Sequence, residues 1–378
     1  MVCIAAFIIL AIVGIVVAFL SIFNRELGKK YLKVFKKSFH CFGKRVRLQK
    51  CDTNFSEDVK TAILKKVVIK RPKLVKPLSI TLEITSILIV VVTVWSLVEG
   101  VKAGLALWTL GTCNVSQPSN CALGADSCSI NEDNLNWFTE WGEIFSNIPD
   151  RLKTWNVLDY INKNDGLNIA FVTGSTEIVD DKNAVKKVAL SIIDPGCSVC
   201  MQSYKNLQKD EKFLKNHVLI VTAYPIKNTD GSYRFKNSEL ISRYILALNI
   251  YTESHYDEAI KNANGIVLDE DWARQTLYGY SEKILNRIFT EYNDEHINYQ
   301  EVFNNRLDND AASALLDSWL KEWGLSDDAL ATVRELVHSD EVTNELNHNA
   351  EIINQNIKPK GIPTMIYDGK KHLGLFKN

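Results

Sequence analysis

Seven residues in the middle of this chain, Asp-Pro-Gly-Cys-Ser-Val-Cys at positions 194–200, restrict its fold more than any other segment. They follow an apolar, β-branched run over residues 185–193, which predicts a buried strand. Residues 197–214 then carry apolar side chains at helical spacing, so we expect a helix to begin at the first cysteine. Unpaired N–H groups at a helix N-terminus favour a thiolate, the reactive form of cysteine. The motif therefore indicates redox chemistry at Cys197 and Cys200.

A structural zinc site is the main alternative for such a Cys-x-x-Cys pair. It needs two further Cys or His ligands at short spacing. No such residue follows Cys200 closely, and the nearest histidine, His217, falls inside the next predicted strand. The sequence therefore predicts no metal site, and an inert dithiol is the remaining alternative.

A second motif, Gly-Ile-Pro-Thr-Met-Ile-Tyr-Asp-Gly, lies far from the first at residues 361–369. It predicts a hydrophobic strand that begins at a proline and closes in an Asp-Gly turn. Taken alone, Pro363 is an ordinary proline at the start of a strand. Its position after a dithiol and a long helical stretch gives it another interpretation.

The order of these motifs resembles the thioredoxin superfamily, and in particular its DsbA-like thiol–disulfide oxidoreductases. In that superfamily a cis-proline loop faces the dithiol, and the residue before the proline offers its backbone to the substrate. The resemblance implies that Cys197 and Cys200 are catalytic, with Cys197 exposed and Cys200 more buried, and that Ile362 and Pro363 bind substrate. Asp194 is a candidate modulator of proton transfer, and a plain turn residue is the simpler interpretation.

The resemblance covers about residues 185–376 and implies an α/β, thioredoxin-like domain over 167–378, with a large helical insertion at about 235–350. The apolar patterns predict strands at 167–173, 185–193, 218–224, 364–367 and 372–376. They predict helices at 197–214, 238–248, 256–263, 269–289, 311–323, 327–338 and 340–356.

Three features depart from the family's pattern. The dipeptide Ser198-Val199 lacks the histidine that family oxidases use to stabilise the thiolate. Ile362 precedes the proline, where valine or threonine is more usual. The residues after the last predicted strand leave no room for the C-terminal helix that covers the sheet in this family. We expect either that helices of the preceding linker replace it or that one face of the sheet is less covered.

Two apolar segments predict transmembrane helices. Residues 1–23 contain no charged residue and are long enough to cross a bilayer, which needs about 20 residues. Basic residues follow this segment instead of preceding it, which favours an uncleaved helix over a signal peptide. The second predicted helix covers residues 78–100, with Glu83 near one interface and Trp95 and Trp108 suited to the other.

The segment between them, residues 24–77, is strongly basic. It holds 17 of the 44 Lys and Arg but only 4 of the 45 Asp and Glu, which leaves 27 basic against 41 acidic residues elsewhere. The positive-inside rule places this loop in the cytoplasm, against anionic lipid, and both the N-terminus and the C-terminal domain outside, most simply at a bacterial cell membrane. Nucleic-acid binding is the alternative, but aromatic interleaving is slight and no binding motif occurs, so we expect no nucleic-acid partner.

Residues 101–166 form an extracytoplasmic linker with amphipathic patterns at about 137–145 and 155–161. It contains Cys113, Cys121 and Cys128, and disulfides persist outside the cytoplasm. We expect two of the three to form a small local disulfide, although their spacing does not decide which. The alternative is that one of them exchanges electrons with the dithiol.

Together these features predict a membrane-tethered, extracytoplasmic thiol–disulfide oxidoreductase that forms disulfides in secreted or surface proteins. The expected partners are protein thiols or disulfides and a membrane redox protein for recycling, and no cofactor is expected. Two alternatives stay open: a reductase or isomerase with the same dithiol, and a non-catalytic binding module. No phosphate loop, Ser-His-Asp arrangement or His-Glu-x-x-His occurs, so nothing indicates a kinase or a hydrolase.

Overall fold

The computed structural model describes residues 74–118, 127–130, 135–161, 166–175, 187–256 and 271–377, with residues 32, 36, 39, 40 and 61. The chain divides into two compact units, Met1–Lys102 and Ala103–Asn378, which we treat separately. The predicted transmembrane segment at 1–23 and nearly all of the basic loop at 24–77 lie outside the described residues.

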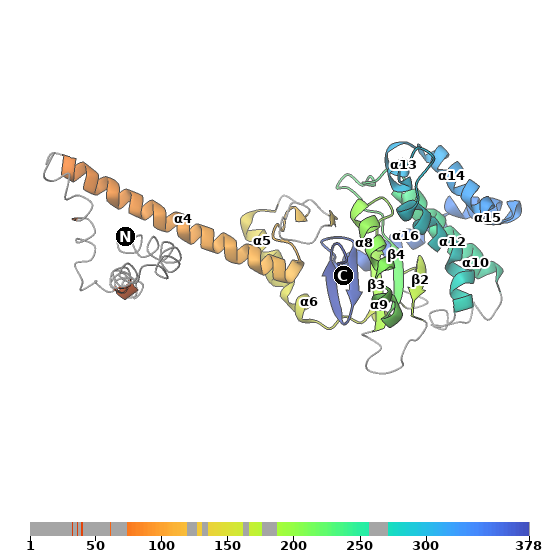
Figure 1. Cartoon of the computed structure of the whole chain (residues 1–378), viewed down its shortest axis with the longest axis horizontal. Coiled ribbons are helices and arrows are strands. Elements are labelled where there is room, and N and C mark those ends of the chain that lie inside the picture. Colours follow the sequence, from red (N-terminus) through yellow and green to blue (C-terminus); the bar gives the residue numbers. More distant parts are fainter. Residues whose placement is uncertain are drawn as a thin grey trace, which may run out of the picture. The chain divides into compact units, whose positions relative to one another are not determined.

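The long helix α4, Val75–Leu110, runs through the second predicted transmembrane segment (Figure 1). It is the one helix of the described residues that is long and apolar enough to cross a membrane, judged by length and composition. Its 36 residues exceed the roughly 20 that a bilayer core requires. Many of its apolar side chains are exposed, among them Ile84, Val92 and Leu97. The helix predicted at 78–100 is therefore present and is longer at both ends.

A five-stranded sheet in the order β2-β4-β3-β6-β7 forms the centre of the second unit. The strands are β2 Phe171–Gly174, β3 Val188–Ile193, β4 Val218–Ala223, β6 Thr364–Tyr367 and β7 Lys370–Leu373. Strands β3 and β4 run parallel, whereas β2 is antiparallel to β4, β6 to β3 and β7 to β6. The sheet thus joins a parallel unit that carries the dithiol to an antiparallel hairpin that follows Pro363, as the motif order predicts.

Strands β3 and β4 are apolar except at Ser191 and Thr222, because both faces of the sheet are covered. All six residues of each strand are buried, and strands buried on both faces consist of continuous hydrophobic runs. Leu190 lies in the middle of β3, opposite Ile220 on one side and Ile366 on the other. It belongs to one continuous buried cluster that joins the sheet to the surrounding helices.

Two short helices connect β3 to β4, where the sequence pattern predicted a single helix over 197–214. They are α8 Ser198–Lys209 and α9 Glu211–Asn216. The single-helix prediction is wrong because the chain breaks at Asp210, whose carboxylate accepts a hydrogen bond from the Phe213 N–H at 2.9 Å and caps α9.

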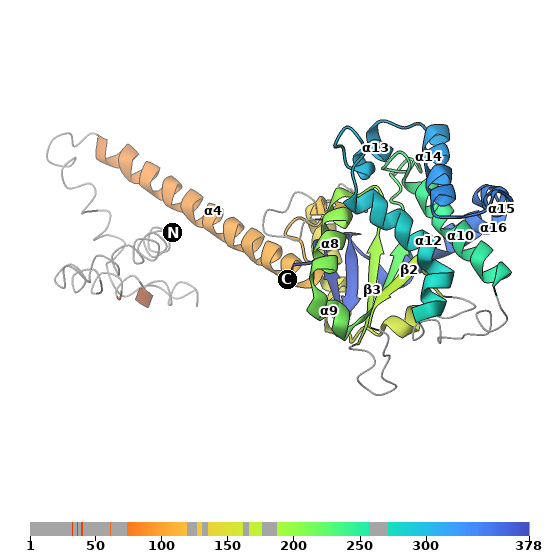
Figure 2. The same ribbon diagram turned by 45° about the vertical axis from the view of Figure 1, so that its right-hand side comes forward.

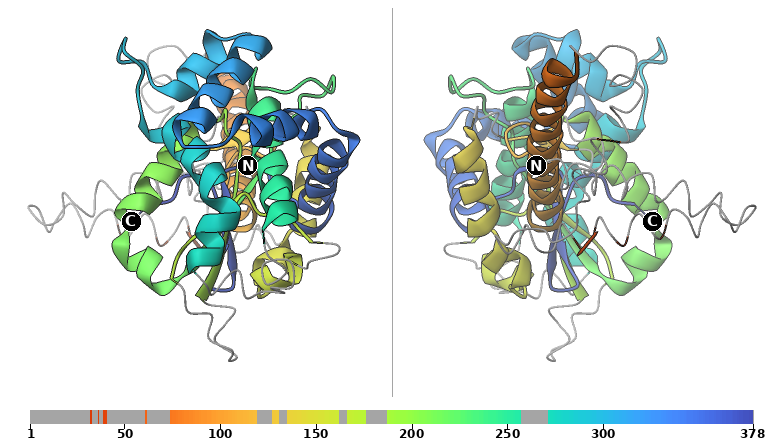
Figure 3. Two further views of the ribbon diagram at one scale, coloured as in Figure 1. Left: turned by 90° about the vertical axis from the view of Figure 1, so that its right-hand side faces the viewer. Right: turned by 90° about the vertical axis from the view of Figure 1, so that its left-hand side faces the viewer.

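The helices between β4 and β6 pack together beside the sheet (Figures 1 and 3). They are α10 Ser238–His255, α12 Asp271–Thr290, α13 Tyr299–Asn305, α14 Asn309–Glu322, α15 Asp327–Val337, α16 Asp340–Ile352 and the π-helical turn η5 Ile353–Ile357. Helix α12 lies against α8 and β2 (Figure 2). The pattern missed α13, and the helix predicted at 256–263 falls almost wholly outside the described residues.

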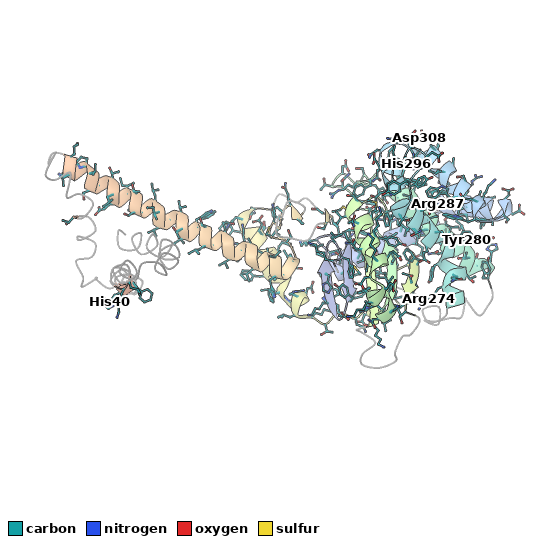
Figure 4. The ribbon with its side chains drawn as sticks, in the orientation of Figure 1. His40, Arg274, Tyr280, Arg287, His296 and Asp308 are labelled. Carbon is teal, nitrogen blue, oxygen red and sulfur yellow. A yellow bond between two sulfur atoms is a disulfide. The ribbon has the colours of Figure 1, made fainter. Side chains whose placement is uncertain are left out.

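Two arginines of α12, Arg274 and Arg287, which Figure 4 labels, form polar contacts with neighbouring elements. Arg287 forms an ion pair with Glu322 of α14 at 2.8 Å. Arg274, one of the buried charged residues, donates to the carbonyl oxygen of Ser175 just after β2, at 3.0 Å. Helix α12 is thus linked both to another helix of the insertion and to the edge of the sheet.

The linker before the sheet packs onto it. Its elements are β1 Cys128–Ser129, α5 Trp137–Ser146, α6 Ile148–Leu152 and the 3-10 turn η3 Val157–Tyr160. Trp155 is buried, and its backbone N–H donates to the carbonyl of Gly369 at 2.9 Å. Turn η3 contacts β3, so the linker covers part of the sheet. The apolar pattern at 155–161 produces this turn and not a full helix.

The hairpin after Pro363 turns where the sequence predicted. Asp368 and Gly369 both have positive φ, 49° and 70°, as a two-residue turn of type I′ requires. The last strand therefore begins at Lys370, and its predicted range of 372–376 is too late. The first strand of the central sheet begins at Phe171, four residues after the predicted start at residue 167.

Truncation of Leu190 tests the buried strand pair. We expect Leu190→Ala to lower the free energy of unfolding by about 2–5 kcal/mol, because it leaves a cavity in the buried cluster on one face of the sheet. The matched control is Leu152→Ala, whose side chain is 71% exposed and whose loss should change stability by less than about 0.5 kcal/mol. Urea unfolding of the detergent-solubilised chain, followed by tryptophan fluorescence, measures both, and equal effects would contradict the packing described here.

Candidate active site

The two cysteines of the motif differ in their bonding. Cys197 is the N-cap residue of α8, and Cys200 lies in its first turn. Cys197 forms a disulfide with Cys128, 69 residues earlier, with the two Cα atoms 6.5 Å apart. Cys200 is a free, buried thiol. The disulfide of this site therefore joins Cys197 to a cysteine of the linker, and not to Cys200.

The local disulfide expected between two of the three linker cysteines does not include Cys128, whose bond to Cys197 is the link to the dithiol that the alternative interpretation requires. Cys113 is also disulfide-bonded, but with a partner outside the described residues. The spacing of the linker cysteines could not reveal the bond to Cys197, because it depends on where the chain before the sheet returns to the dithiol.

Backbone pairing brings Cys128 to that position. Strand β1 runs antiparallel to β5, Gly361–Ile362, with Cys128 opposite Ile362. Beyond it, the N–H of Ile130 donates to the carbonyl of Lys360 at 3.3 Å. The residues before Pro363 thus present their backbone to an extended segment, and this segment belongs to the same chain.

The proline loop and the dithiol meet at this point. The Ile362–Pro363 peptide bond is cis, and the sulfur of Cys197 lies 3.8 Å from the carbonyl oxygen of Ile362. A disulfide sulfur has no hydrogen to donate, so this is a van der Waals contact. The fold therefore brings Cys197 to Ile362, 165 residues further along the chain.

Cys197 is buried, contrary to the expectation that it is the exposed sulfur. Its exposed fraction is 0%. The linker strand that is bonded to it explains this, because β1 lies along β5 and covers the loop that faces the dithiol. In this state no external thiol reaches Cys197 unless the strand moves.

The Cys200 thiol has a high pKa. Burial raises the pKa of this thiol well above its usual value, and the charge of Asp194 raises it further. The backbone N–H of Asp194, which donates to the Cys200 sulfur at 3.4 Å, lowers the pKa in part. Cys200 is therefore protonated and unreactive near neutral pH unless a nearby group accepts its proton.

Asp194 is a fully buried carboxyl group and not merely a turn residue. One oxygen accepts from the N–H of Gly196 at 2.7 Å and from the hydroxyl of Ser238, and the other accepts from the N–H of Ile226 at 2.7 Å. Burial raises the pKa of Asp194 to about 6, although these hydrogen bonds act to lower it. The group consequently changes its protonation state within the range in which proton transfer at neutral pH operates.

Two amide side chains of α13 hold the loop that leads into the dithiol. The side-chain NH₂ of Gln300 donates to the carbonyls of Pro195 at 2.9 Å and Cys197 at 3.1 Å. Asn304 donates to the carbonyl of Gly196 at 2.8 Å. Sequence reasoning missed both, because an amide in a helical insertion carries no local signal of a partner about 100 residues away.

Arg234 was also missed, and it contacts the linker strand directly. It lies between β4 and α10, where its backbone N–H donates to the carbonyl of Ile226 at 2.8 Å. Its guanidinium donates to the carbonyl of Ser129 and reaches the side-chain oxygen of Asn228 at 3.4 Å. Strand β1 is therefore held by Arg234 as well as by β5.

Among the described residues, no group of three or more His, Cys, Asp or Glu side chains is arranged to hold a metal ion. His217 lies just before β4, where its ring packs on Phe213 and one nitrogen is 3.2 Å from Asp368. His217, the histidine nearest to Cys200 in the sequence, thus makes structural contacts with Phe213 and Asp368.

The pKa of Asp194 predicts how stability depends on pH. The folded state holds this proton up to about pH 6, whereas an unfolded aspartate releases it near pH 3.9. Between these values the folded state binds more protons, so the contribution of Asp194 to stability falls as pH rises. Between about pH 4 and pH 7, the free energy of unfolding of the wild-type chain should fall, relative to that of Asp194→Asn, by on the order of 3 kcal/mol.

Urea unfolding of both proteins across this pH range gives the difference. Asp230→Asn is the control, because hydrogen bonds from Ser232 lower the pKa of this exposed carboxyl. Its effect should be small and opposite in sign. Parallel stability curves for the wild type and Asp194→Asn would mean that this carboxyl titrates normally.

No protein-family model matches the chain, and no curated protein matches it in sequence. Among solved structures, it is similar to the MdbA protein of Actinomyces oris, a thiol-disulfide oxidoreductase, with 16% identity, 53% of this chain and 79% of that chain covered, and a TM-score of 0.32. The MdbA protein of Corynebacterium diphtheriae gives 15% identity, 56% and 91% coverage and a TM-score of 0.32. The catalytic domain of Proteus mirabilis ScsC gives 13% identity, with 56% of this chain and 84% of that chain covered, and a TM-score of 0.31. The comparisons therefore assign the chain to no family.

Proposed function

We propose that this chain is a thiol–disulfide oxidoreductase in which Cys197 exchanges disulfides with protein substrates. The observation that carries the proposal is the bond from Cys197 to Cys128, a cysteine outside its own motif, beside the residues that precede Pro363. The Cys197 sulfur lies at a helix N-cap and is bonded to an extended segment, and the free thiol of Cys200 follows one turn later. This is the arrangement of a mixed disulfide that a second thiol can resolve.

The reaction needs only the two cysteines of the motif. In the oxidised enzyme with a Cys197–Cys200 bond, a substrate thiolate attacks the sulfur of Cys197, and Cys200 leaves as a thiol. A second substrate thiol then attacks the substrate sulfur of this mixed disulfide, which leaves the substrate oxidised and the dithiol reduced. Ile362 pairs with the substrate backbone, Pro363 ends that pairing, and Asp194 accepts and returns the Cys200 proton.

We propose the oxidising direction as the physiological one. Cys197 caps α8, and the N–H groups and dipole at that end stabilise its thiolate. A stabilised thiolate favours the reduced enzyme, and an enzyme that prefers its reduced form is an oxidant. A membrane redox partner then reoxidises the dithiol. A reductase or isomerase that uses the same dithiol is the alternative.

We propose further that α4 tethers the domain to a membrane. The support is its length and its exposed apolar side chains, which lipid accommodates and water does not. The basic residues at 24–77 support a cytoplasmic position for that loop by the positive-inside rule, and hence a domain on the outer side, most simply at a bacterial cell membrane.

Trapping of mixed disulfides tests the exchange reaction. We expect the double variant Cys128→Ser/Cys200→Ser to form a covalent adduct with partly reduced ribonuclease, because Cys197 attacks and no thiol resolves the product. Cys128 is replaced so that it cannot form a disulfide with Cys197. Non-reducing electrophoresis after an acid quench measures the adduct.

The matched control is Cys128→Ser/Cys197→Ser, which keeps the buried thiol and should form less than about a tenth as much adduct. If neither double variant forms an adduct although both are folded, the chain is a binding module that uses no thiol chemistry.

The redox potential of Cys128→Ser tests the direction. Equilibration in graded glutathione buffers, followed by thiol alkylation, should give a value nearer to about −120 mV than to about −270 mV. A value near the lower figure would make the chain a reductase, and its partner would then be a source of electrons.

A further inference from the structure

Strand β1 has the connections of a bound substrate. It is two residues long, and within the described residues it pairs with β5 alone, apart from the central sheet. Its cysteine is bonded to Cys197 and lies opposite Ile362. A separate peptide undergoing the proposed reaction would make the same two links, one through its sulfur and one through its backbone.

We propose that residues 127–130 are an internal substrate strand, which closes the active site of the oxidised chain and leaves when Cys200 displaces Cys128 from Cys197. This inference rests on the proposed function, since it requires that Cys197 exchanges disulfides. It adds a third redox cysteine, Cys128, and it describes the peptide that the open site accepts.

The opening step needs no external reagent. The Cys200 thiol gives its proton to the Asp194 carboxylate, and the thiolate attacks the sulfur of Cys197. The Cys197–Cys200 bond forms, the Cys197–Cys128 bond breaks, and Cys128 leaves as a thiolate that takes up a proton. One disulfide and one thiol are present before and after, so nothing is oxidised or reduced overall.

Strand β5 packs closely against residues 127–128. A Cβ atom at Gly361 would lie 2.8 Å from the Ser127 hydroxyl and 3.0 Å from the carbonyl oxygen of Cys128. Real Cβ atoms are hardly ever found 2.8 Å from another heavy atom, so only glycine lets the two strands approach this closely. Ser127 and Ser129 are both buried there.

One feature of the closed strand favours release. The Ser127 hydroxyl is buried and has no hydrogen-bond partner in the described part of the chain. A buried hydroxyl without a partner lowers the stability of the state that contains it. Opening returns this hydroxyl to water, which partly offsets the loss of the backbone pairing.

The contacts of the strand define the peptide that replaces it. Arg234 donates to the carbonyl of Ser129, a backbone contact that any sequence can make. Ile130 is buried in the main core cluster and also lines a cavity of about 570 Å³. The site therefore suits an extended, reduced peptide with a cysteine, a small residue after it, and an apolar residue at the second position after the cysteine.

Disulfide mapping and peptide oxidation together test the closure. The oxidised full-length chain in detergent is alkylated, digested without reduction and analysed by mass spectrometry, and Cys128–Cys197 should be the main bond of the site. The oxidised protein is then mixed with about 0.1 mM reduced acetyl-Ser-Cys-Ser-Ile-amide. A tethered strand competes at a millimolar effective concentration, so Cys128→Ser should form the peptide adduct at least about tenfold faster than the wild type.

The outcomes separate the two proposals. A wild type with a Cys197–Cys200 bond and a free Cys128, or equal adduct rates for the wild type and Cys128→Ser, overturns the closure while exchange activity stands. A Cys128→Ser protein that carries the Cys197–Cys200 bond but forms no adduct overturns the proposed function, and the closure with it.

Arg234→Ala gives a second test, because it should affect peptide adduct formation in opposite directions in the wild type and in Cys128→Ser. Loss of its hydrogen bond to the strand should speed adduct formation by the wild type, because the closed state is weakened. In Cys128→Ser the same change should raise the peptide concentration for half-maximal rate by about tenfold. The control is Lys236→Ala, an exposed cation of the same loop, which should change neither. Slowing in both backgrounds would mean that Arg234 supports only the fold, and the strand would not be a substrate mimic.

Discussion

The pairing of β3 on both of its edges is the constraint on which the site depends. Parallel pairing with β4 sets the carboxyl ends of the two strands side by side, so the Asp194 carboxylate after β3 reaches the N–H of Ile226 after β4 at 2.7 Å. Antiparallel pairing with β6 brings the chain before Thr364 back to the same edge. Backbone ladders between buried strands are rigid. The dithiol, the buried carboxyl and the proline loop are therefore positioned by the sheet and not by the loops that carry them.

Burial governs the chemistry of this edge. It disfavours the charged forms of both Cys200 and Asp194, and it raises both pKa values. The charge of Asp194 raises the pKa of Cys200 further, so the thiol stays protonated while the carboxylate is ionised. A thiol in such a position reacts only when another group accepts its proton, and in the proposed reaction that group is Asp194. The amides of α13 keep this geometry by holding the carbonyls of Pro195, Gly196 and Cys197. The helical insertion thus supports the site from outside the sheet.

Local patterns in the sequence were enough to predict most of the domain. The β-branched run before the dithiol, the helix that starts at Cys197 and the Asp-Gly turn at 368–369 depend on neighbouring residues, and all three are present. Predictions were wrong where a single side chain overrode the periodicity. Asp210 breaks the helix after the dithiol, because its carboxylate caps a new one. The short α13 carries too few apolar residues to show a helical period.

The candidate residues Cys197, Cys200, Ile362, Pro363 and Asp194 were all chosen from motifs, since each motif places its chemistry within a few residues. The bonding and burial of the two cysteines depend on contacts between distant segments. The bond from Cys128 to Cys197, the donor Arg234 and the amides Gln300 and Asn304 have no local signature, because each depends on where another part of the chain packs. Residue types and their spacing thus specify which groups can react. Which sulfur is bonded to which, and how deeply each is buried, depends on the three-dimensional packing of the linker against the strand before Pro363.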